Sequence, residues 1–149
     1  EKVQFMIAPN VGEELRPLSR IASGGELSRL LLAIKVILAE AEAVPTMVFD
    51  EIDTGIGGHT AGKVGEKLRA LSATCQVLCV THLPVIASYG AHHYSVTKAS
   101  LGERTAVSAR ELSDDERVSE LIRMFGGSGE TESATYAHAK ELLAKSCGI

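Results

Sequence analysis

Apolar and polar positions along this chain follow two periodicities, which predict strands and helices in alternation. The runs at residues 45–50 and 76–80 predict two strands, and the second is so uniformly apolar that neither of its faces should be wet. Residues 27–38 are apolar almost all round, so we expect a helix buried on most faces. Between the two strands, four apolar residues recur at helical spacing: Ala61, Val64, Leu68 and Leu71.

Shorter patterns and turn residues complete the expected order of elements. They predict a strand at 3–7, a turn at 9–12, a helix opened by Pro84, a hairpin of residues 93–99 and 105–112 around 101–103, a helix after a capping box at 113–116, and a last helix at 131–145. Strand–helix–strand order favours parallel pairing with right-handed crossovers. The expected fold class is therefore α/β, a mostly parallel sheet flanked by helices with a small antiparallel hairpin.

Length, charge and composition limit the number of domains and the kinds of partner to expect. The chain has 149 residues, the size of one domain, and its net charge of −4 gives no global basic field to attract nucleic acid. It has neither a signal peptide nor an apolar run long enough to span a bilayer, so we expect no membrane partner. It begins with Glu1 and not with methionine, which we interpret as the start of a piece excised from a longer protein.

Three cysteines suggest reduced thiols and not a disulfide framework. A zinc site of Cys75, Cys79 and His82 is a weak alternative. Positions four apart on a strand lie about 13 Å from each other, whereas one tetrahedral zinc needs ligands about 2.0–2.3 Å from itself.

A glycine loop precedes the apolar helix, in the order Ser23, Gly24, Gly25, Glu26. The simple interpretation is a capping box, in which Ser23 and Glu26 satisfy each other's backbone amides. A helix N-terminus after glycines also exposes amides and a positive dipole end, which suits phosphate. Taken alone, the loop indicates only a helix cap. The acidic residues at the end of the following strand favour a phosphate-binding site instead.

Asp50 and Glu51 end the first apolar strand. Acidic residues at a strand exit often form a solvated turn. Here they follow a buried strand, however, and ligands bind at the carboxyl edge of open α/β sheets. Adjacent side chains on a strand point in different directions. One carboxylate can therefore serve Mg²⁺ while the next polarises an attacking water.

Residues 57–64 nearly match the phosphate-binding pattern G-x-x-x-x-G-K-[ST]. Val64 lacks the hydroxyl that this pattern needs for Mg²⁺, and the apolar helical stripe already starts at Ala61. We therefore expect Gly62 and Lys63 to lie within a helix, so the chain has no Walker A motif.

Taken in order, these motifs resemble the RecN family, an SMC-like branch of the ABC-type ATPases. Four stretches carry the resemblance: Ala22-Ser23-Gly24-Gly25-Glu26-Leu27-Ser28-Arg29, Phe49-Asp50-Glu51-Ile52-Asp53-Thr54-Gly55-Ile56-Gly57-Gly58, Thr81-His82-Leu83-Pro84 and Arg123-Met124-Phe125-Gly126-Gly127. The resemblance implies that residues 1–149 form the C-terminal lobe of an ABC-type P-loop ATPase head.

The resemblance also implies a role for each motif residue. Asp50 would hold Mg²⁺, Glu51 would be the general base, and His82 would be the switch histidine that hydrogen-bonds the γ-phosphate of ATP. The signature residues Ser23, Gly24, Gly25 and Glu26 would contact ATP bound to a second head, and Asp53 would face the opposite subunit. Residues 54–58 depart from the Ala-Leu-Asp pattern of transporters, so details taken from transporters do not carry over to this loop. The other histidines, at positions 59, 92, 93 and 138, are interpreted as surface or structural residues.

The implied function is an ATPase of double-strand break repair whose two heads clamp ATP in a homodimer. Its partners would be a Walker A lobe of the same protein, a second head and DNA, in the cytoplasm at the nucleoid. The fragment alone should be inactive. The alternatives are the head of another SMC-type protein, such as a cohesin-like head, and a non-catalytic DNA-binding or scaffolding module.

Overall fold

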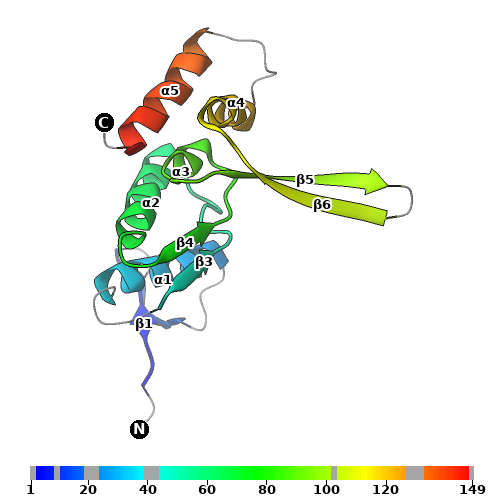
Figure 1. Ribbon diagram of the computed structural model, residues 1–149. Helices are drawn as coiled ribbons and strands as arrows, with labels where there is room; N and C mark the ends of the chain where they lie inside the picture. The colour runs from blue at the N-terminus through cyan, green and yellow to red at the C-terminus, as the bar shows by residue number, and fades with distance from the viewer. Residues whose placement is uncertain are drawn as a thin grey trace.

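A short parallel strand pair forms the centre of the chain, and two helices pack together over one of its faces (Figure 1). The computed structural model describes residues 3–8, 11–18, 24–38, 44–101, 104–126 and 133–147. The elements in chain order are β1 (Met6–Ile7), β2 (Arg16–Pro17), α1 (Gly24–Leu38), β3 (Thr46–Phe49), α2 (Gly58–Leu71), β4 (Gln76–Cys79), α3 (Pro84–Ser88), β5 (Tyr94–Leu101), β6 (Arg104–Glu111), α4 (Asp114–Met124) and α5 (Ser133–Cys147).

The main core lies between α1, α2 and the inner face of the β3–β4 pair. Strands β3 and β4 run parallel with Thr46 opposite Gln76 and Phe49 opposite Cys79. Side chains alternate across a strand, so Met47 and Phe49 share the inner face with the β4 residues opposite them. Leu32 of α1 and the apolar stripe of α2 complete this core. The packing explains why the helical spacing at 61–71 predicted α2 correctly.

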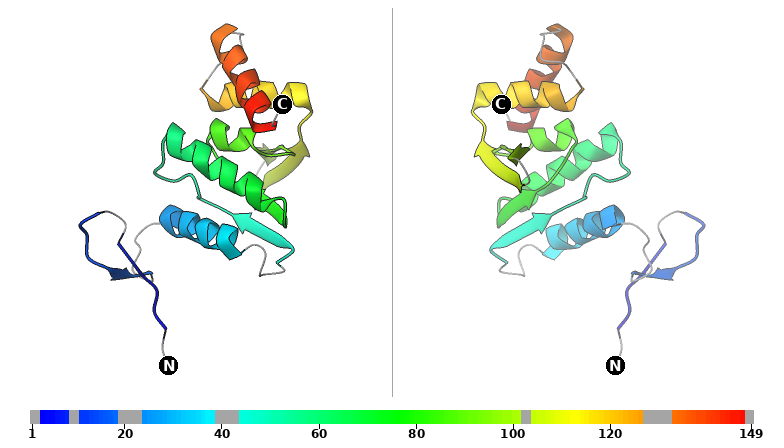
Figure 2. Two further views of the ribbon diagram at one scale, coloured as in Figure 1. Left: turned by 90° about the vertical axis from the view of Figure 1, so that its left-hand side faces the viewer. Right: turned by 90° about the vertical axis from the view of Figure 1, so that its right-hand side faces the viewer.

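A second, smaller core joins the last two helices to α3. Val118 and Leu121 of α4 pack with Ala139 of α5, and Ala87 of α3 lies against them. The Ser146 hydroxyl of α5 donates to the Ser88 carbonyl of α3 at 2.6 Å. The capping box predicted at Ser113 is present at the start of α4. Figure 2 shows α4 and α5 stacked beyond α3, on the far side of α2 from α1.

The antiparallel hairpin is larger than the sequence indicated. Strands β5 and β6 have eight residues each and pair from Tyr94 opposite Glu111 to Leu101 opposite Arg104. They extend away from the body of the molecule (Figure 1). β1 and β2 form another short antiparallel pair, so β3–β4 is the one parallel pair in the described ranges. The α/β class is confirmed, whereas a mostly parallel sheet is only partly so.

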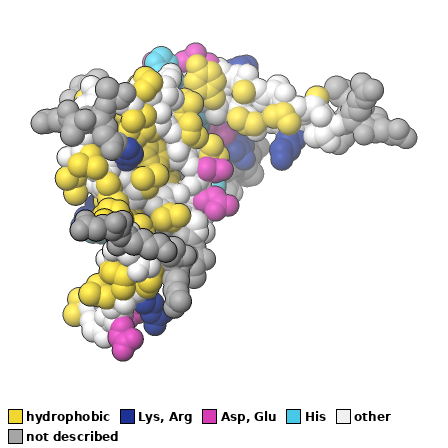
Figure 3. Space-filling model, turned by 90° about the horizontal axis from the view of Figure 1, so that it is seen from below, with side chains coloured by type: hydrophobic (Ala, Val, Ile, Leu, Met, Phe, Trp, Pro, Cys, Tyr) yellow, Lys and Arg dark blue, Asp and Glu magenta, His cyan; other side chains and the backbone are white. Residues whose placement is uncertain are grey.

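Two burial predictions were wrong. Only Gly25 and Leu32 of α1 are buried, while Leu31 is 47% exposed and Ile37 80% exposed. On the outer face of the strand pair, Val48 and Leu78 are exposed, as is the Val80 side chain just after β4. The cause is that one helical layer covers one face of the pair, and nothing in the described part of the chain covers the other. Several apolar patches are also visible on the side of the molecule seen in Figure 3.

The remaining predictions differ at element ends or fall outside the described residues. Helix α1 begins at Gly24, three residues before its predicted start, and α5 begins and ends two residues later than predicted. Some predicted features lie outside the described residues: Ser23, the turn residues Pro9 and Asn10, and the hairpin tip at 102–103. No helix in the described ranges combines the length and the apolar character needed to cross a membrane.

Candidate functional site

The parallel pairing of β3 and β4 places two sequence motifs at one edge of the sheet. The Val80 amide donates to the Phe49 carbonyl at 2.9 Å, so the ladder continues to the last residues of both strands. Asp50 and Glu51 leave β3 at the edge where Thr81 and His82 leave β4. This is the carboxyl edge, where ligands bind in open α/β sheets.

Glu51 has a left-handed backbone at this edge. Its φ is 56°, a region that non-glycine residues seldom occupy. The Glu51 amide donates to Oδ1 of Asp50 at 2.9 Å, which holds the two acidic residues in a tight turn. Both side chains are exposed. A strained residue kept at such a position is a reason to look for a function there.

The first turn of α1 packs directly against this turn. A Cβ on Gly24 would lie 2.8 Å from Oε2 of Glu51, and a Cβ on Gly25 would lie 2.9 Å from the Glu51 carbonyl oxygen. Gly25 is therefore required by the close approach of backbone, whereas the contact at Gly24 is with the end of the exposed Glu51 side chain, which can move aside. Glu26 follows them and is exposed. The structure thus brings Gly24, Gly25 and Glu51 together, while Ser23 lies outside the described residues.

Two residues of α1 that were given no role in the sequence fasten the helix to the same loop. The Ser28 hydroxyl donates to the Asp50 carbonyl at 3.1 Å. Nη1 of Arg29 donates to the carbonyl oxygens of Ile52 at 3.1 Å and Thr54 at 2.8 Å. The signal that could have found them is that residues 27–38 are otherwise apolar apart from Lys35. Polar side chains that interrupt an apolar helix next to a glycine loop are candidates for loop anchors.

Asp53 turns inward, away from the position expected of a residue that faces another subunit. Its side chain is 3% exposed, and its Oδ2 accepts from the Thr81 hydroxyl at 2.5 Å and from the His82 amide at 2.7 Å. Nδ1 of His82 lies 2.9 Å from the same oxygen. The carboxylate is thus bound within its own chain, and the predicted contact with a second head stays a prediction.

Opposing effects set the pKa of Asp53. Burial raises it, but the hydrogen bonds from the Thr81 hydroxyl and from backbone amides, together with the nearby His82 ring, outweigh burial and hold the pKa below its ordinary value. Cys79, the last residue of β4, behaves oppositely. Burial raises the pKa of its thiol to about 11, and the negative charges of Asp53 and Asp50 add to this increase.

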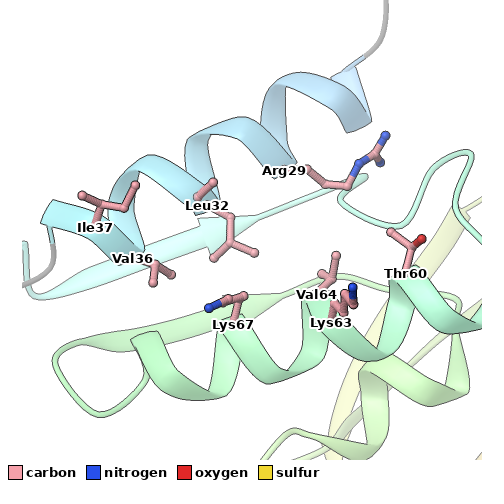
Figure 4. Close-up of a pocket in the computed structure, with 9 residues that line it drawn as sticks. Arg29, Leu32, Val36, Ile37, Thr60, Lys63, Val64 and Lys67 are labelled. Atoms are coloured by element: carbon pink, nitrogen blue, oxygen red, sulfur yellow. The ribbon is translucent and has the colours of Figure 1, made fainter. Parts of the chain in front are cut away.

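The remaining predicted features lie elsewhere. Gly62 and Lys63 are within α2, which starts at Gly58, so they form no phosphate loop. Lys63 and Lys67 line a groove of about 310 Å³ between α1 and α2, with Leu32 and Val36 on the opposite side (Figure 4). No group of three or more His, Cys, Asp or Glu side chains suited to a metal occurs among residues 3–8, 11–18, 24–38, 44–101, 104–126 and 133–147.

The other histidines are spread over the molecule. Nδ1 of His92 lies 2.6 Å from Glu111 at the base of the hairpin, and the ring of His138 packs 5.2 Å from that of Phe125. His93 is half-buried, and burial, with the neighbouring Arg117, lowers its pKa. His59 is exposed at the start of α2.

Known proteins resemble this chain along nearly its whole length. It is 51% identical over 144 residues to the DNA repair protein RecN of Treponema pallidum, 49% identical over 143 residues to that of Haemophilus influenzae, and 45% identical over 141 residues to that of Bacillus subtilis. These alignments cover 95–96% of this chain but only 24–25% of each relative. The chain thus spans about a quarter of the length of the curated relatives it matches.

Two further comparisons add less. No protein-family model matches the chain. A solved structure from work on ATP-driven dimerisation and DNA-stimulated activation of SMC ATPases aligns with a TM-score of 0.48 and 20% identity, over 75% of this chain and 68% of that one. The resemblance read from the motifs is confirmed by the sequence relatives: over nearly all its length, this chain matches a segment of the DNA repair protein RecN.

Proposed function

We propose that this chain is the C-terminal lobe of an ATP-hydrolysing head in an SMC-like DNA repair protein of the RecN type. One observation carries the proposal. Three features meet at one edge of the parallel pair: the start of α1, the turn at Asp50 and Glu51, and His82 after β4. Identities of 43–51% to RecN proteins support the same assignment.

Glu51 is the general base in this proposal. Its carboxylate is exposed beside Gly24, where it can accept a proton from a water molecule. Asp50 would hold Mg²⁺, because carboxylate oxygens are the protein ligands that this ion takes, usually along with several waters. Bound there, the ion would neutralise phosphate charge. His82, with its side chain 73% exposed, is the residue that reaches the terminal phosphate.

The signature residues serve the ATP of a second head. Amides at the N-terminus of α1 suit a phosphate because they lack partners within the helix and lie at its positive dipole end. Ser23, Gly24, Gly25 and Glu26 would therefore close the nucleotide site of a partner in a homodimer. A separate Walker A lobe of the same protein would hold the β- and γ-phosphates, and DNA would be bound by the whole protein at the nucleoid in the cytoplasm.

A non-catalytic DNA-binding or scaffolding module is less well supported. The net charge of −4 gives the chain no overall positive field that would attract DNA. Such a module also gives no reason for a carboxylate in left-handed backbone at a sheet edge.

Replacement of the base tests the proposal in the full-length protein. Glu51→Gln should lower ATP turnover by about 10²–10⁴-fold, the usual contribution of a general base, and leave ATP binding intact. The matched control is Glu66→Gln, the same change at an exposed position on α2, which should leave turnover unchanged. Turnover of Glu51→Gln near that of the wild type would show that Glu51 is not the base.

Mixing of variants tests the shared site. Ser23→Arg should spare ATP binding to one head and block turnover, because it places a bulky side chain where a phosphate meets the helix N-terminus. Combined with a Walker A-deficient head, it should leave at most one working site. Full activity of Ser23→Arg alone would mean that the loop is only a helix cap.

A further inference from the structure

We propose that Asp53 is the positioning residue for His82: its carboxylate fixes the imidazole with a proton on Nδ1 and directs Nε2 out of the sheet edge. The functional meaning rests on the proposed ATPase activity, because it concerns the ring that would meet the phosphate. The position of the proton itself does not depend on that activity.

The first support is the geometry around one oxygen atom. Oδ2 of Asp53 receives the Thr81 hydroxyl at 2.5 Å and the His82 amide at 2.7 Å, and lies 2.9 Å from Nδ1 of His82. The Thr81 hydroxyl also accepts from the Leu83 amide at 3.1 Å, so the segment that carries the ring is held from both sides. The same carboxylate thus binds the backbone amide of His82 and places its negative charge beside Nδ1 of the ring.

The carboxylate of this pair is buried, whereas the ring is exposed. Asp53 is 3% exposed, whereas the side chain of His82 is 73% exposed. Water can therefore reach the outer part of the ring but hardly compete for the carboxylate. A buried carboxylate needs hydrogen-bond donors to offset its desolvation, and it obtains them from residues 81 and 82.

The chemistry of the acceptor then determines the tautomer. An ionised carboxylate accepts but cannot donate, and its negative charge lies 2.9 Å from Nδ1 in a close electrostatic contact, beside the two hydrogen bonds that Oδ2 accepts from the Thr81 hydroxyl and the His82 amide. Nδ1 of His82 therefore carries the proton, and in the neutral ring Nε2 is the acceptor. The reverse tautomer would place the Nδ1 lone pair 2.9 Å from a negative oxygen.

A definite consequence follows for phosphate recognition. The neutral His82 ring can accept a hydrogen bond at Nε2, for example from water, but has no proton there to give to a phosphate oxygen. It becomes a donor at Nε2 only as the imidazolium, for which Asp53 is the counter-ion. Because Asp53 holds the proton on Nδ1, whether His82 can donate a hydrogen bond at Nε2 depends on whether the ring is protonated.

The first test measures the tautomer directly, on unmodified protein. Nitrogen-15 chemical shifts of the histidine rings, recorded above the pH at which they titrate, distinguish Nδ1–H from Nε2–H. His82 should show Nδ1–H. Exposed His59, for which the described residues offer no partner, supplies the reference for an unconstrained ring. An Nε2–H signature for His82 in the wild type would overturn the proposal without any variant.

The second test removes the charge. Asp53→Asn keeps the shape but provides an amide that can donate as well as accept, so the preference for Nδ1–H should be lost. In the full-length protein, kcat should fall about 10–100-fold, the size of effect known for the carboxylate partners of metal-bound histidines, with KM for ATP little changed. Thr81→Val is the control, because it removes one donor to Asp53 but leaves the ring contact; its tautomer should match the wild type.

If the wild-type tautomer is Nδ1–H and the wild-type protein has no ATPase activity, the proposed function fails and the positioning role holds. If Asp53→Asn retains both tautomer and kcat, the positioning role fails.

Discussion

Two histidine–carboxylate pairs in this chain look alike in distance and differ in surroundings. Nδ1 of His92 lies 2.6 Å from Glu111 at the base of the hairpin, and Nδ1 of His82 lies 2.9 Å from Asp53 at the strand ends. Both histidine side chains are 73% exposed, but Glu111 is 49% exposed and Asp53 only 3%. The shorter contact is therefore the one that water can replace. The exposed pair is a hydrogen bond that water can replace, whereas the buried Asp53 is held by the Thr81 hydroxyl and the His82 amide, and the His82 ring contributes a close electrostatic contact.

The largest expected effect is on stability. Asp53→Ala leaves the Thr81 hydroxyl and the His82 amide without their acceptor, and we expect a loss of about 1.5–3 kcal/mol in the free energy of unfolding, as for hydrogen bonds to charged groups. Glu111→Ala is the matched change at the hairpin and should produce no resolvable loss. Urea denaturation of both variants measures the contrast. Equal losses would mean that burial does not separate the two pairs.

A second contrast compares crowded and open glycines. Gly25→Ala would push a methyl group against the Glu51 carbonyl oxygen and Thr54, both within 3.0 Å, which should destabilise the chain by about 1–3 kcal/mol. Gly62→Ala makes the same change inside α2, where a Cβ meets nothing within 4 Å. It should stabilise the chain by about 0.5–1 kcal/mol through better helix propensity. Thermal unfolding of the two variants should therefore shift in opposite directions.

The acid dependence of stability should also follow Asp53. Its pKa is lower in the folded chain than in the unfolded one, so its contribution is present above the unfolded value, about 3.9, and is lost as the pH falls through the folded value. The stability difference between wild type and Asp53→Asn should accordingly be full at neutral pH and vanish in strong acid. Unfolding measured from pH 7 to pH 2 tests this. A difference that stays constant to pH 2 would contradict it.

The smallest expected effect concerns Cys79. Its pKa of about 11 keeps the thiol protonated at neutral pH, so alkylation of Cys79 by iodoacetamide should be slow. Asp53→Asn removes one of the negative charges that raise this pKa and should speed alkylation by a few-fold. Replacement of Cys75 and Cys147 by serine makes the measurement specific. Unchanged alkylation, measured under conditions in which both proteins are fully folded, would show that burial alone sets the reactivity.

The sequence predicted the parts of the site that lie within one segment. Helical spacing located α2, the capping residue Ser113 located the start of α4, and the position of Glu51 after an apolar strand pointed to the sheet edge. These features depend on residues close in sequence, whose periodicity and turn chemistry are visible without a fold.

The sequence predicted that His82 would lie near Asp50 if the two strands were neighbours, but it predicted none of the side-chain contacts between segments. That Asp53 binds residues 81 and 82 depends on the register of β3 against β4 and on the turn between Glu51 and Gly55, neither of which periodicity specifies. The expected burial of α1 and β4 failed for a related reason. An apolar face shows that something should cover it, but not whether the covering element belongs to the same stretch of chain.

The hydrogen bonds of Arg29 have a mechanical consequence. Its guanidinium binds the carbonyl groups of Ile52 and Thr54, the two residues on either side of Asp53. The first turns of α1 are therefore linked to the loop at 52–54 by the hydrogen bonds of Arg29, and that loop is linked to His82 through Asp53. A displacement of the first turns of α1 would therefore act on His82 through residues 52–54.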